Sequence, residues 1–213
     1  MQIQYSDILT FERNYRANLI NSITGFKSVS LLGTKSENGN FNLAIFSQIF
    51  HVGANPPLIG VLFRPESTLG GNHSLKNVRN TEYFTLNHIR ADFFKQAHQT
   101  SARYGDEISE FDAVGLTPFF TEKFYAPYVE ESPIKIGLKK EEEIPLKING
   151  TTLIIASVQE LIVDDAFILE DGFVDLNKAG SITCSGLDAY LTTQKLGRLS
   201  YAKPNEELKN LDF

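Results

Sequence analysis

The sequence consists largely of short apolar runs separated by turn-forming residues. Six runs have the length and the β-branched or aromatic content of strands, namely residues 26–34, 41–52, 58–63, 83–89, 134–140 and 151–163. Asn38-Gly39 separates the first two runs and Asn149-Gly150 precedes the last one, and both pairs are typical of hairpin turns. The pattern therefore predicts a protein built mainly from antiparallel strands.

Three stretches refine this prediction. The run 58–63 (LIGVLF) is continuously apolar, so we expect it to be buried on both faces. Asn55-Pro56-Pro57 precedes it and must interrupt a strand ladder, because proline has no backbone N–H to donate. The charged run 139–145 (KKEEEIP) is most simply a solvated strand end or turn.

Helical spacing is weaker and lies between the strands. Four segments have it in part: residues 5–23, read as a short helix or arm, then 74–80, 91–105 and 107–116. Strands joined by short turns, with helices inserted between some of them, favour a mainly β fold of the barrel type. Because 213 residues suit one hydrophobic core, we expect a single domain over residues 1–213.

Composition and charge narrow the function classes. The formal net charge of −6 disfavours binding to nucleic acid, whose phosphates an acidic surface repels. Cys184 is the single cysteine, which excludes an intramolecular disulfide and favours a reducing, cytoplasmic location. The N-terminal residues contain Asp7, Glu12 and Arg13 among apolar ones, so we expect no signal peptide, and no stretch is apolar enough to span a membrane.

The strand predicted at 42–51 could seat a flat ring. Alternation places Asn42, Ala44, Phe46 and Gln48 on one face, while Ser47 interrupts the apolar opposite face. The small Ala44 between two amides leaves room for a ring to approach the backbone, and a buried Ser47 hydroxyl needs a hydrogen-bond partner. The alternative is a barrel strand with routine polar positions.

The segment 64–80 could bind an anion at the start of a helix. Gly70-Gly71 permits a tight turn, and Asn72 or Ser74 can cap the helix that follows, whose free N–H groups attract negative charge. Cations and hydroxyls surround this point: Arg64, Ser67, Thr68, Ser74, Lys76 and Arg79. The segment has neither Walker spacing nor GxGxxG, so a capped surface helix with solvated basic residues is the alternative.

Other kinds of active site have little support in the sequence. His51, His73, His88 and His98 lack the spacing of metal ligands, so we expect no metal site. Cys184 has no evident base beside it and no GxSxG elbow is present, which argues against nucleophilic catalysis. We assign no side chain as a catalytic acid or base.

Read in order, the motifs resemble the flavin reductase-like family with the FMN-binding split barrel, from about Arg13 to Tyr190. The matching pieces are N-x-A-x-F-S (Asn42, Ala44, Phe46, Ser47), Asn-Pro-Pro, Arg64, S-x-x-N-V (Ser74, Asn77, Val78), EYFTLN (82–87), EFDAVGLTP (110–118), EESPIKI (130–136) and SGLDAY (185–190). Two positions depart from the family pattern. His73 replaces an acidic residue, and Gly137-Leu138 replaces the more typical Glu-Cys.

The resemblance implies a split β-barrel and an FMN-dependent NAD(P)H oxidoreductase that passes a hydride through bound FMN to a flavin or similar acceptor. It assigns Asn42, Ala44, Phe46, Ser47 and Gln48 to the flavin ring and ribityl chain. It assigns the binding of the phosphate to a second set of residues: Arg64, Ser67, Ser74, Lys76 and Asn77.

The resemblance also implies partners: NADH or NADPH as hydride donor, and a monooxygenase in some relatives. It implies a homodimer with each flavin near the subunit interface, and symmetric pairing would bury the exposed apolar edge of the barrel and the aromatic passage 119–128. An FMN-binding electron carrier or storage protein without nicotinamide turnover is the alternative function. A relative that has lost flavin and serves as an interaction module is a third.

Overall fold

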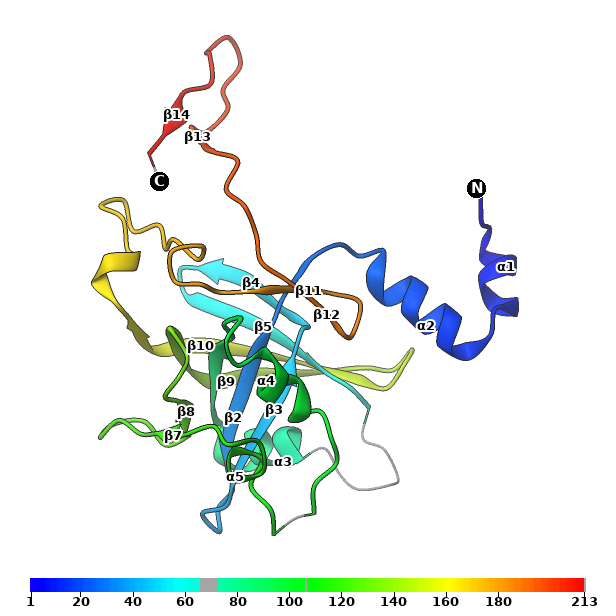
Figure 1. The fold of residues 1–213 in the computed structure, drawn as a ribbon, viewed down its shortest axis with the longest axis vertical. Coiled ribbons are helices and arrows are strands. Elements are labelled where there is room, and N and C mark those ends of the chain that lie inside the picture. The colour runs from blue at the N-terminus through cyan, green and yellow to red at the C-terminus, as the bar shows by residue number, and fades with distance from the viewer. Residues whose placement is uncertain (66–72, 106, 213) are drawn as a thin grey trace.

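The computed structural model describes residues 1–65, 73–105 and 107–212. Its centre is a seven-stranded antiparallel sheet with the order β3-β2-β6-β9-β10-β5-β4 (Figure 1). The strands are β2 (Ser30–Lys35), β3 (Phe41–Phe46), β4 (Ile49–Ala54), β5 (Pro57–Phe63), β6 (Tyr83–His88), β9 (Ile134–Leu146) and β10 (Thr151–Val163). The mainly β fold class is thus confirmed.

The two edges of this sheet are joined by only two residues. β3 and β4 lie at opposite ends of the strand order, yet Ser47 and Gln48 alone separate them in the chain. The sheet must therefore curl until its edges meet, which makes a barrel with a gap on one side. The Gln48 carbonyl accepts a hydrogen bond of 2.9 Å from the Leu62 backbone N–H, so the chain has already crossed to β5 at that point.

This crossing corrects the single strand predicted at 41–52. Phe46 still pairs with Ser30 of β2, whereas Ile49 pairs with Val61 of β5. Alternation continues through the junction, so the polarity pattern carries no sign of the change of partner. The other expected hairpin features are present: Gly39 (φ +90°) lies in the β2–β3 turn, and the Asn55–Pro56 peptide between β4 and β5 is cis.

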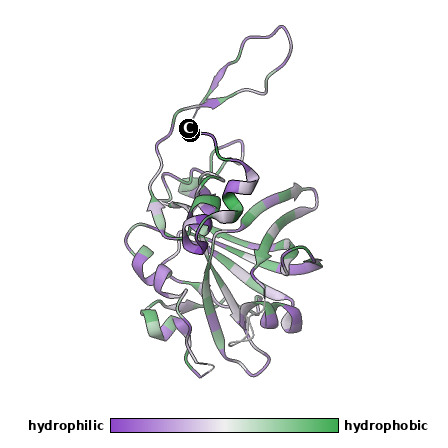
Figure 2. Ribbon diagram, turned by 90° about the vertical axis from the view of Figure 1, so that its right-hand side faces the viewer, coloured by the Kyte–Doolittle hydropathy of each residue, from purple (hydrophilic) through white to green (hydrophobic). Residues whose placement is uncertain are grey.

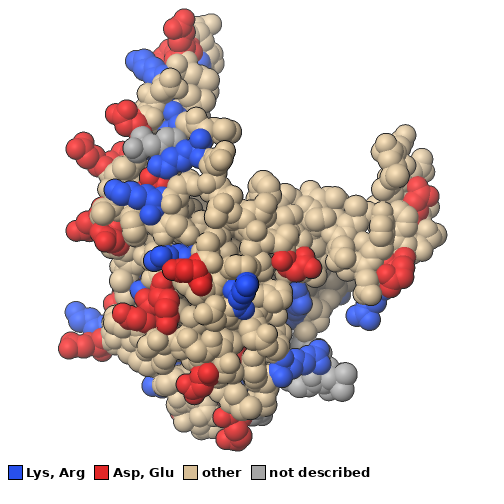
Figure 3. Space-filling view, in the orientation of Figure 1, with Lys and Arg blue, Asp and Glu red and all other residues tan. Residues whose placement is uncertain are grey.

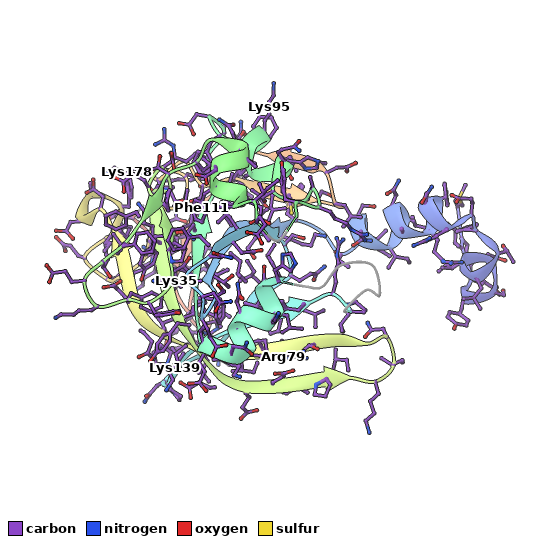
Figure 4. All side chains as sticks on the ribbon, turned by 90° about the horizontal axis from the view of Figure 1, so that it is seen from below. Lys35, Arg79, Lys95, Phe111, Lys139 and Lys178 are labelled. Carbon is purple, nitrogen blue, oxygen red and sulfur yellow. The ribbon has the colours of Figure 1, made fainter. Side chains whose placement is uncertain are left out.

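The long β9–β10 hairpin extends beyond the predicted strand 134–140. Residues 139–145 continue β9 and pair with residues 152–157 of β10, so this charged run is a solvated strand end. The run 58–63 is buried or half-buried at every position, in agreement with its continuous apolar sequence. Arg79 on the neighbouring helix forms an ion pair of 2.7 Å with Glu143 beside this hairpin (Figure 4).

The described residues form five α-helices. α3 (His73–Thr81), α4 (Phe94–Gln99) and α5 (Glu110–Val114) pack against the barrel, whereas α1 (Tyr5–Thr10) and α2 (Arg13–Ser22) lie in an arm that projects from it (Figure 1). The helix predicted at 91–105 is wrong in length, because α4 ends at Gln99. The Thr100 hydroxyl donates to the Ala97 carbonyl (2.7 Å), and the Ser101 N–H donates to the His98 carbonyl (3.0 Å). These local bonds compete with the helical pattern.

Short elements complete the fold. β1 (Lys27–Ser28), β11 (Thr183–Ser185) and β12 (Ala189–Leu191) form a small sheet, and β7 (Pro118–Phe119) pairs with β8 (Tyr128–Val129). A 3-10 turn, η1 (Asp165–Phe167), follows β10, and β13 (Arg198–Leu199) pairs with β14 (Asn210–Leu211) in a projecting C-terminal hairpin. No helix in the described residues is long and apolar enough to cross a membrane.

Two of the three apolar clusters in the described residues lie on opposite faces of the curled sheet, and the third is a small one around Phe124 and Tyr128. One, between the barrel strands and α3, contains Leu32, Phe63 and Phe84. The other lies under α4 and α5 and contains Leu31, Leu43 and Phe111 (Figure 4). The neighbours Leu31 and Leu32 thus face opposite cores, as strand alternation requires. Figure 2 shows how hydrophobic stretches follow the strands of the body.

His88, at the end of β6, is half-buried and lies in surroundings that resist its protonation. Its Nδ1 lies 2.9 Å from the Ser181 hydroxyl, and burial lowers its pKa from 6.5 to about 4. The unfolded chain therefore binds a proton below about pH 6.5 that the folded protein takes up only near pH 4. Stability contributed by the neutral ring is present above this window and is lost as the pH falls through it.

We therefore expect the free energy of unfolding to fall by about 2 kcal/mol between about pH 7 and pH 4 because of His88. This is less than the full shift would give, since the ring is only partly removed from water. Urea unfolding across this range measures the slope. His88→Gln is expected to flatten it, and an unchanged slope in that variant would contradict the assignment.

Candidate functional site

A cavity of about 540 Å³ opens beside the gap in the barrel. Its walls come from four places: the end of β3 with the connector to β4, the end of β5, the turn after α4, and the β11–β12 hairpin. Asn21 of α2 adds to the rim. The volume lies in the range of small-molecule and cofactor sites.

Four of the predicted ring-binding residues lie on this cavity. Ala44, Phe46, Ser47 and Gln48 all line it, because the chain turns away from β2 at this point and leaves β3 without a partner on one side. Phe46 packs edge to face on Phe63, with ring centroids 4.9 Å apart. The local sequence thus gives the cavity an apolar wall next to a polar corner.

Ser47 is half-buried at the polar corner of the cavity, and the Cys184 thiol of β11 lines the same space. Burial raises the pKa of Cys184, and this effect outweighs the lowering by the Lys27 charge and the Ser47 hydroxyl. The thiol therefore stays protonated at neutral pH, and a protonated thiol is a poor nucleophile. This agrees with the absence of an expected nucleophilic role.

The turn after α4 supplies part of the wall that the sequence pattern did not predict. His98, Thr100, Ser101 and Arg103 line the cavity opposite the β3–β4 connector, and Tyr190 joins them from β12. The sequence offers no local signal for this set, because their contact with the site depends on a tertiary approach. The early end of α4 is what turns residues 100–103 toward the cavity.

His98 and Tyr190 form a pair within this wall. The His98 Nδ1 lies 2.7 Å from the Tyr190 hydroxyl, and the two rings meet edge to face at 88°. Burial raises the pKa of Tyr190 to about 12, so the phenol keeps its proton at neutral pH. In the neutral histidine the phenol donates to Nδ1, which leaves Nε2 as the ring donor.

Two arginines bring positive charge to the cavity. Arg64 follows β5 and Arg103 follows α4, and both line the same space although the chain as a whole is acidic. Arginine suits the bidentate recognition of phosphate and carboxylate groups. Ser67, with Thr68 and Gly70-Gly71, belongs to the predicted anion loop but lies outside the described residues.

The remaining predicted phosphate residues lie around α3. Asn42 donates to the Ser74 hydroxyl (2.9 Å), and Asn77 donates to the Thr34 hydroxyl (3.0 Å), in a buried polar seam between this helix and strands β2 and β3. Lys76 is exposed on the same helix. These residues lie apart from the described lining of the cavity, and the seam fixes the start of α3 against the sheet.

A buried carboxylate holds β3 from the other side. Glu110 of α5 accepts a hydrogen bond of 3.0 Å from the Leu43 backbone N–H, and burial raises its pKa. The contact satisfies a backbone donor on the open edge of the sheet, directly before Ala44. In the described residues, no group of three or more His, Cys, Asp and Glu is arranged to hold a metal ion.

Comparison with known proteins identifies the family to which the chain belongs. Residues 26–174 match the family model described as flavin reductase like domain. A candidate flavin reductase with a split barrel domain from Shewanella frigidimarina is 44% identical, with a TM-score of 0.91, covering 95% of this chain and all of the other. Nitrilotriacetate monooxygenase component B from Bacillus cereus, 21% identical, shares the fold (TM-score 0.80; 93% and 98% covered).

A protein of Aquifex aeolicus without an assigned function is 29% identical over 145 residues, which is 65% of this chain and 72% of the other. The matched segment 26–174 contains the barrel strands, α3 and the residues of the β3–β4 connector. The chain belongs to the flavin reductase-like family, whose members bind flavin, and the resemblance found in the motifs is confirmed.

Proposed function

We propose that this protein is an FMN-dependent NAD(P)H oxidoreductase that reduces a flavin or a similar acceptor. The observation that carries the proposal is the cavity at the gap of the barrel. Most of its lining lies in the matched segment 26–174, whereas Asn21, Cys184, Leu187 and Tyr190 lie outside it. The cavity combines an apolar wall at Ala44 and Phe46, a polar corner at Ser47 and Gln48, and positive charge at Arg64 and Arg103.

These surroundings fit a flat ring that carries a phosphorylated chain. The small side chain of Ala44 lets a ring approach β3 closely, and Ser47 and Gln48 offer polar atoms to its edge. Arg64 favours a phosphate at the end of β5. We also keep Ser74, Lys76 and Asn77, at the start of α3, as part of the proposed phosphate site. We extend the proposed phosphate site to Arg103, which the sequence did not suggest.

When bound, FMN supplies a ring that accepts a hydride from a reduced nicotinamide and passes the electrons to an acceptor. The protein must then hold the ring, keep one side accessible and balance the phosphate charge. Gln48 and Arg64 are exposed, so the cavity opens to solvent beside them. The His98–Tyr190 pair offers a fixed Nε2 donor on the opposite wall, suited to positioning a polar group of the second substrate.

Anaerobic titration of the FMN-loaded protein with NADH and NADPH tests this function. We expect the yellow absorbance of the flavin to bleach at a rate that saturates with nicotinamide. If dithionite bleaches the flavin but neither nicotinamide does, the protein is an electron carrier or an FMN store. If the purified protein does not bind added FMN, it is an interaction module.

The proposal includes a homodimer and a cytoplasmic location, and it leaves room for a monooxygenase that consumes the reduced flavin. Cys184 is a free, buried thiol, which suits a reducing compartment. The aromatic passage 119–128 is largely anchored on its own barrel, because Tyr128 and Phe124 pack together at 5.4 Å and Tyr128 is fully buried. Phe120 and Tyr125 of the same passage are exposed, so part of it remains available for the proposed dimer contact.

A further inference from the structure

The open edge of β3 has a buried acidic side chain near its start and the cavity near its end. β3 is the last strand in the order of the seven-stranded sheet, so one of its edges pairs with no other described strand. On this edge the Leu43 N–H donates to the Glu110 carboxylate of α5 (3.0 Å). Ile45, two residues later, lines the cavity. The same edge therefore connects Glu110 with the proposed flavin site.

The geometry of the strand gives the spacing between these two points. β3 pairs with β2 over all six of its residues. Backbone N–H groups of an antiparallel strand alternate between its two edges, so the Ile45 N–H points to the same edge as the Leu43 N–H. Two residues of such a strand span ~7 Å. The Glu110 carboxylate thus lies on the order of 10 Å from a ring that packs against Ala44 and Ile45.

Glu110 is buried, yet its contacts favour the ionised form. Only 8% of the residue is exposed, and this burial raises its pKa. Three interactions lower the pKa in turn: the Leu43 N–H, the backbone of Glu110 itself, and the charge of His73 at the start of α3. Each of them stabilises a carboxylate relative to a carboxylic acid. At about pH 8, well above the ordinary range of a glutamate, Glu110 therefore carries a negative charge.

The burial of this charge distinguishes it from the charges at the surface. Figure 3 shows acidic and basic side chains interspersed over the visible face of the molecule. Water and salt screen exposed charges of this kind, and neighbours of opposite sign offset one another. A buried charge is screened much less. The field of Glu110 therefore extends along the edge of β3 into the cavity.

A negative charge at this place affects the two oxidation states of a flavin differently. A hydride consists of one proton and two electrons. Its transfer oxidises the nicotinamide and adds two electrons, one proton and therefore one unit of negative charge to the ring. A nearby carboxylate consequently opposes the reduced ring more than the neutral oxidised ring.

We propose that Glu110 lowers the reduction potential of the bound flavin. The side chain does not line the cavity, so it acts through space across the edge of β3 and not by touching the ring. A lower potential makes the reduced flavin a stronger electron donor toward its acceptor. The inference deepens the proposed function, on which it rests. With an effective dielectric constant of about 20, a unit charge ~10 Å away shifts the preference for oxidised over reduced flavin roughly tenfold.

The reduction potentials of the FMN-loaded variants Glu110→Gln and Asp112→Asn test this role. Glutamine keeps an oxygen that can accept from the Leu43 N–H, so this variant removes the charge and retains the contact. Its potential at pH 8 is expected to rise by about 30 mV, which is the tenfold change for a two-electron couple. Asp112 lies two residues further along α5 and is exposed, so Asp112→Asn removes the same charge and should leave the potential unchanged.

A second measurement uses the wild-type protein. If the carboxylate and the reduced ring repel each other, reduction of the flavin must raise the pKa of Glu110 further, because coupling between two sites is reciprocal. The carbon NMR signal of the Glu110 carboxyl group, followed against pH in the oxidised and in the reduced protein, measures this change.

Three results would overturn the inference: equal potentials in the wild type and Glu110→Gln, equal shifts in both variants, or a Glu110 pKa that does not respond to reduction. Dithionite reduces the flavin in both measurements, so they do not depend on nicotinamide turnover. A protein that dithionite bleaches and neither nicotinamide does would contradict the proposed oxidoreductase function alone. Failure to bind FMN would contradict both.

Discussion

Replacement of Ala44 by phenylalanine is expected to abolish FMN binding, with a loss of affinity of at least about 100-fold. Ala44 lines the cavity at the end of β3, next to the polar corner of Ser47 and Gln48. A phenyl group at this position would occupy the space that the ring of the cofactor needs. Quenching of flavin fluorescence during titration with the protein measures the change.

Ala54→Phe is the matched control, because Ala54 is exposed at the end of β4 and lies outside the cavity lining. The control should bind FMN as the wild type does. Full FMN affinity in Ala44→Phe, with an unchanged circular dichroism spectrum, would show that the flavin binds elsewhere on the protein.

Replacement of Gly33 by alanine is expected to have the largest effect on stability, with a loss of about 3 kcal/mol in the free energy of unfolding. A Cβ atom on Gly33 would overlap the Pro127 carbonyl oxygen and would lie 2.7 Å from the Thr85 hydroxyl. That hydroxyl donates to the same carbonyl (2.6 Å) and accepts from the Asn87 amide (2.8 Å). The substitution therefore disrupts these buried hydrogen bonds, and the Pro127 carbonyl cannot easily move away because it belongs to the backbone.

Gly60→Ala provides the comparison for Gly33→Ala. Its Cβ would meet the ring of Phe50, at 2.5 Å from Cζ, but Phe50 is 47% exposed and can rotate away. We expect a change below about 1 kcal/mol, because alanine also reduces the backbone freedom of the unfolded chain. Chemical denaturation of both variants measures and compares their losses in the free energy of unfolding. Equal losses would mean that the Pro127 contact is not the cause.

The strands were predictable because their signals are local. Alternation and the turn residues at Asn38-Gly39 and Asn149-Gly150 act over a few positions, and β10 occupies the predicted range 151–163. The point where one run changes partner was not predictable. Between Phe46 and Ile49 the same alternation serves two different edges of the sheet, so only the closure of the barrel reveals the break.

The candidate site was predictable on one wall only. Ala44, Phe46, Ser47 and Gln48 follow one another in sequence, and the strand pattern groups them. Arg103 and Tyr190 come to the same cavity from segments far along the chain, and their approach depends on where α4 ends and how β12 packs. Asn42, Ser74 and Asn77 were predicted as ligands. In the fold their hydrogen bonds also join α3 to the sheet, and the sequence gives no sign of this second role.

The order of strands also has a consequence for synthesis. β5 pairs with β10, and Phe63 is paired with Thr152, almost ninety positions later in the chain. During translation the ribosome must therefore release residues 151–163 before β5 gains this neighbour. The β9–β10 hairpin, which is local in sequence, is the unit onto which the earlier strands can then close. Until then a nascent chain has an incomplete sheet with open edges, a state that chaperones can shield.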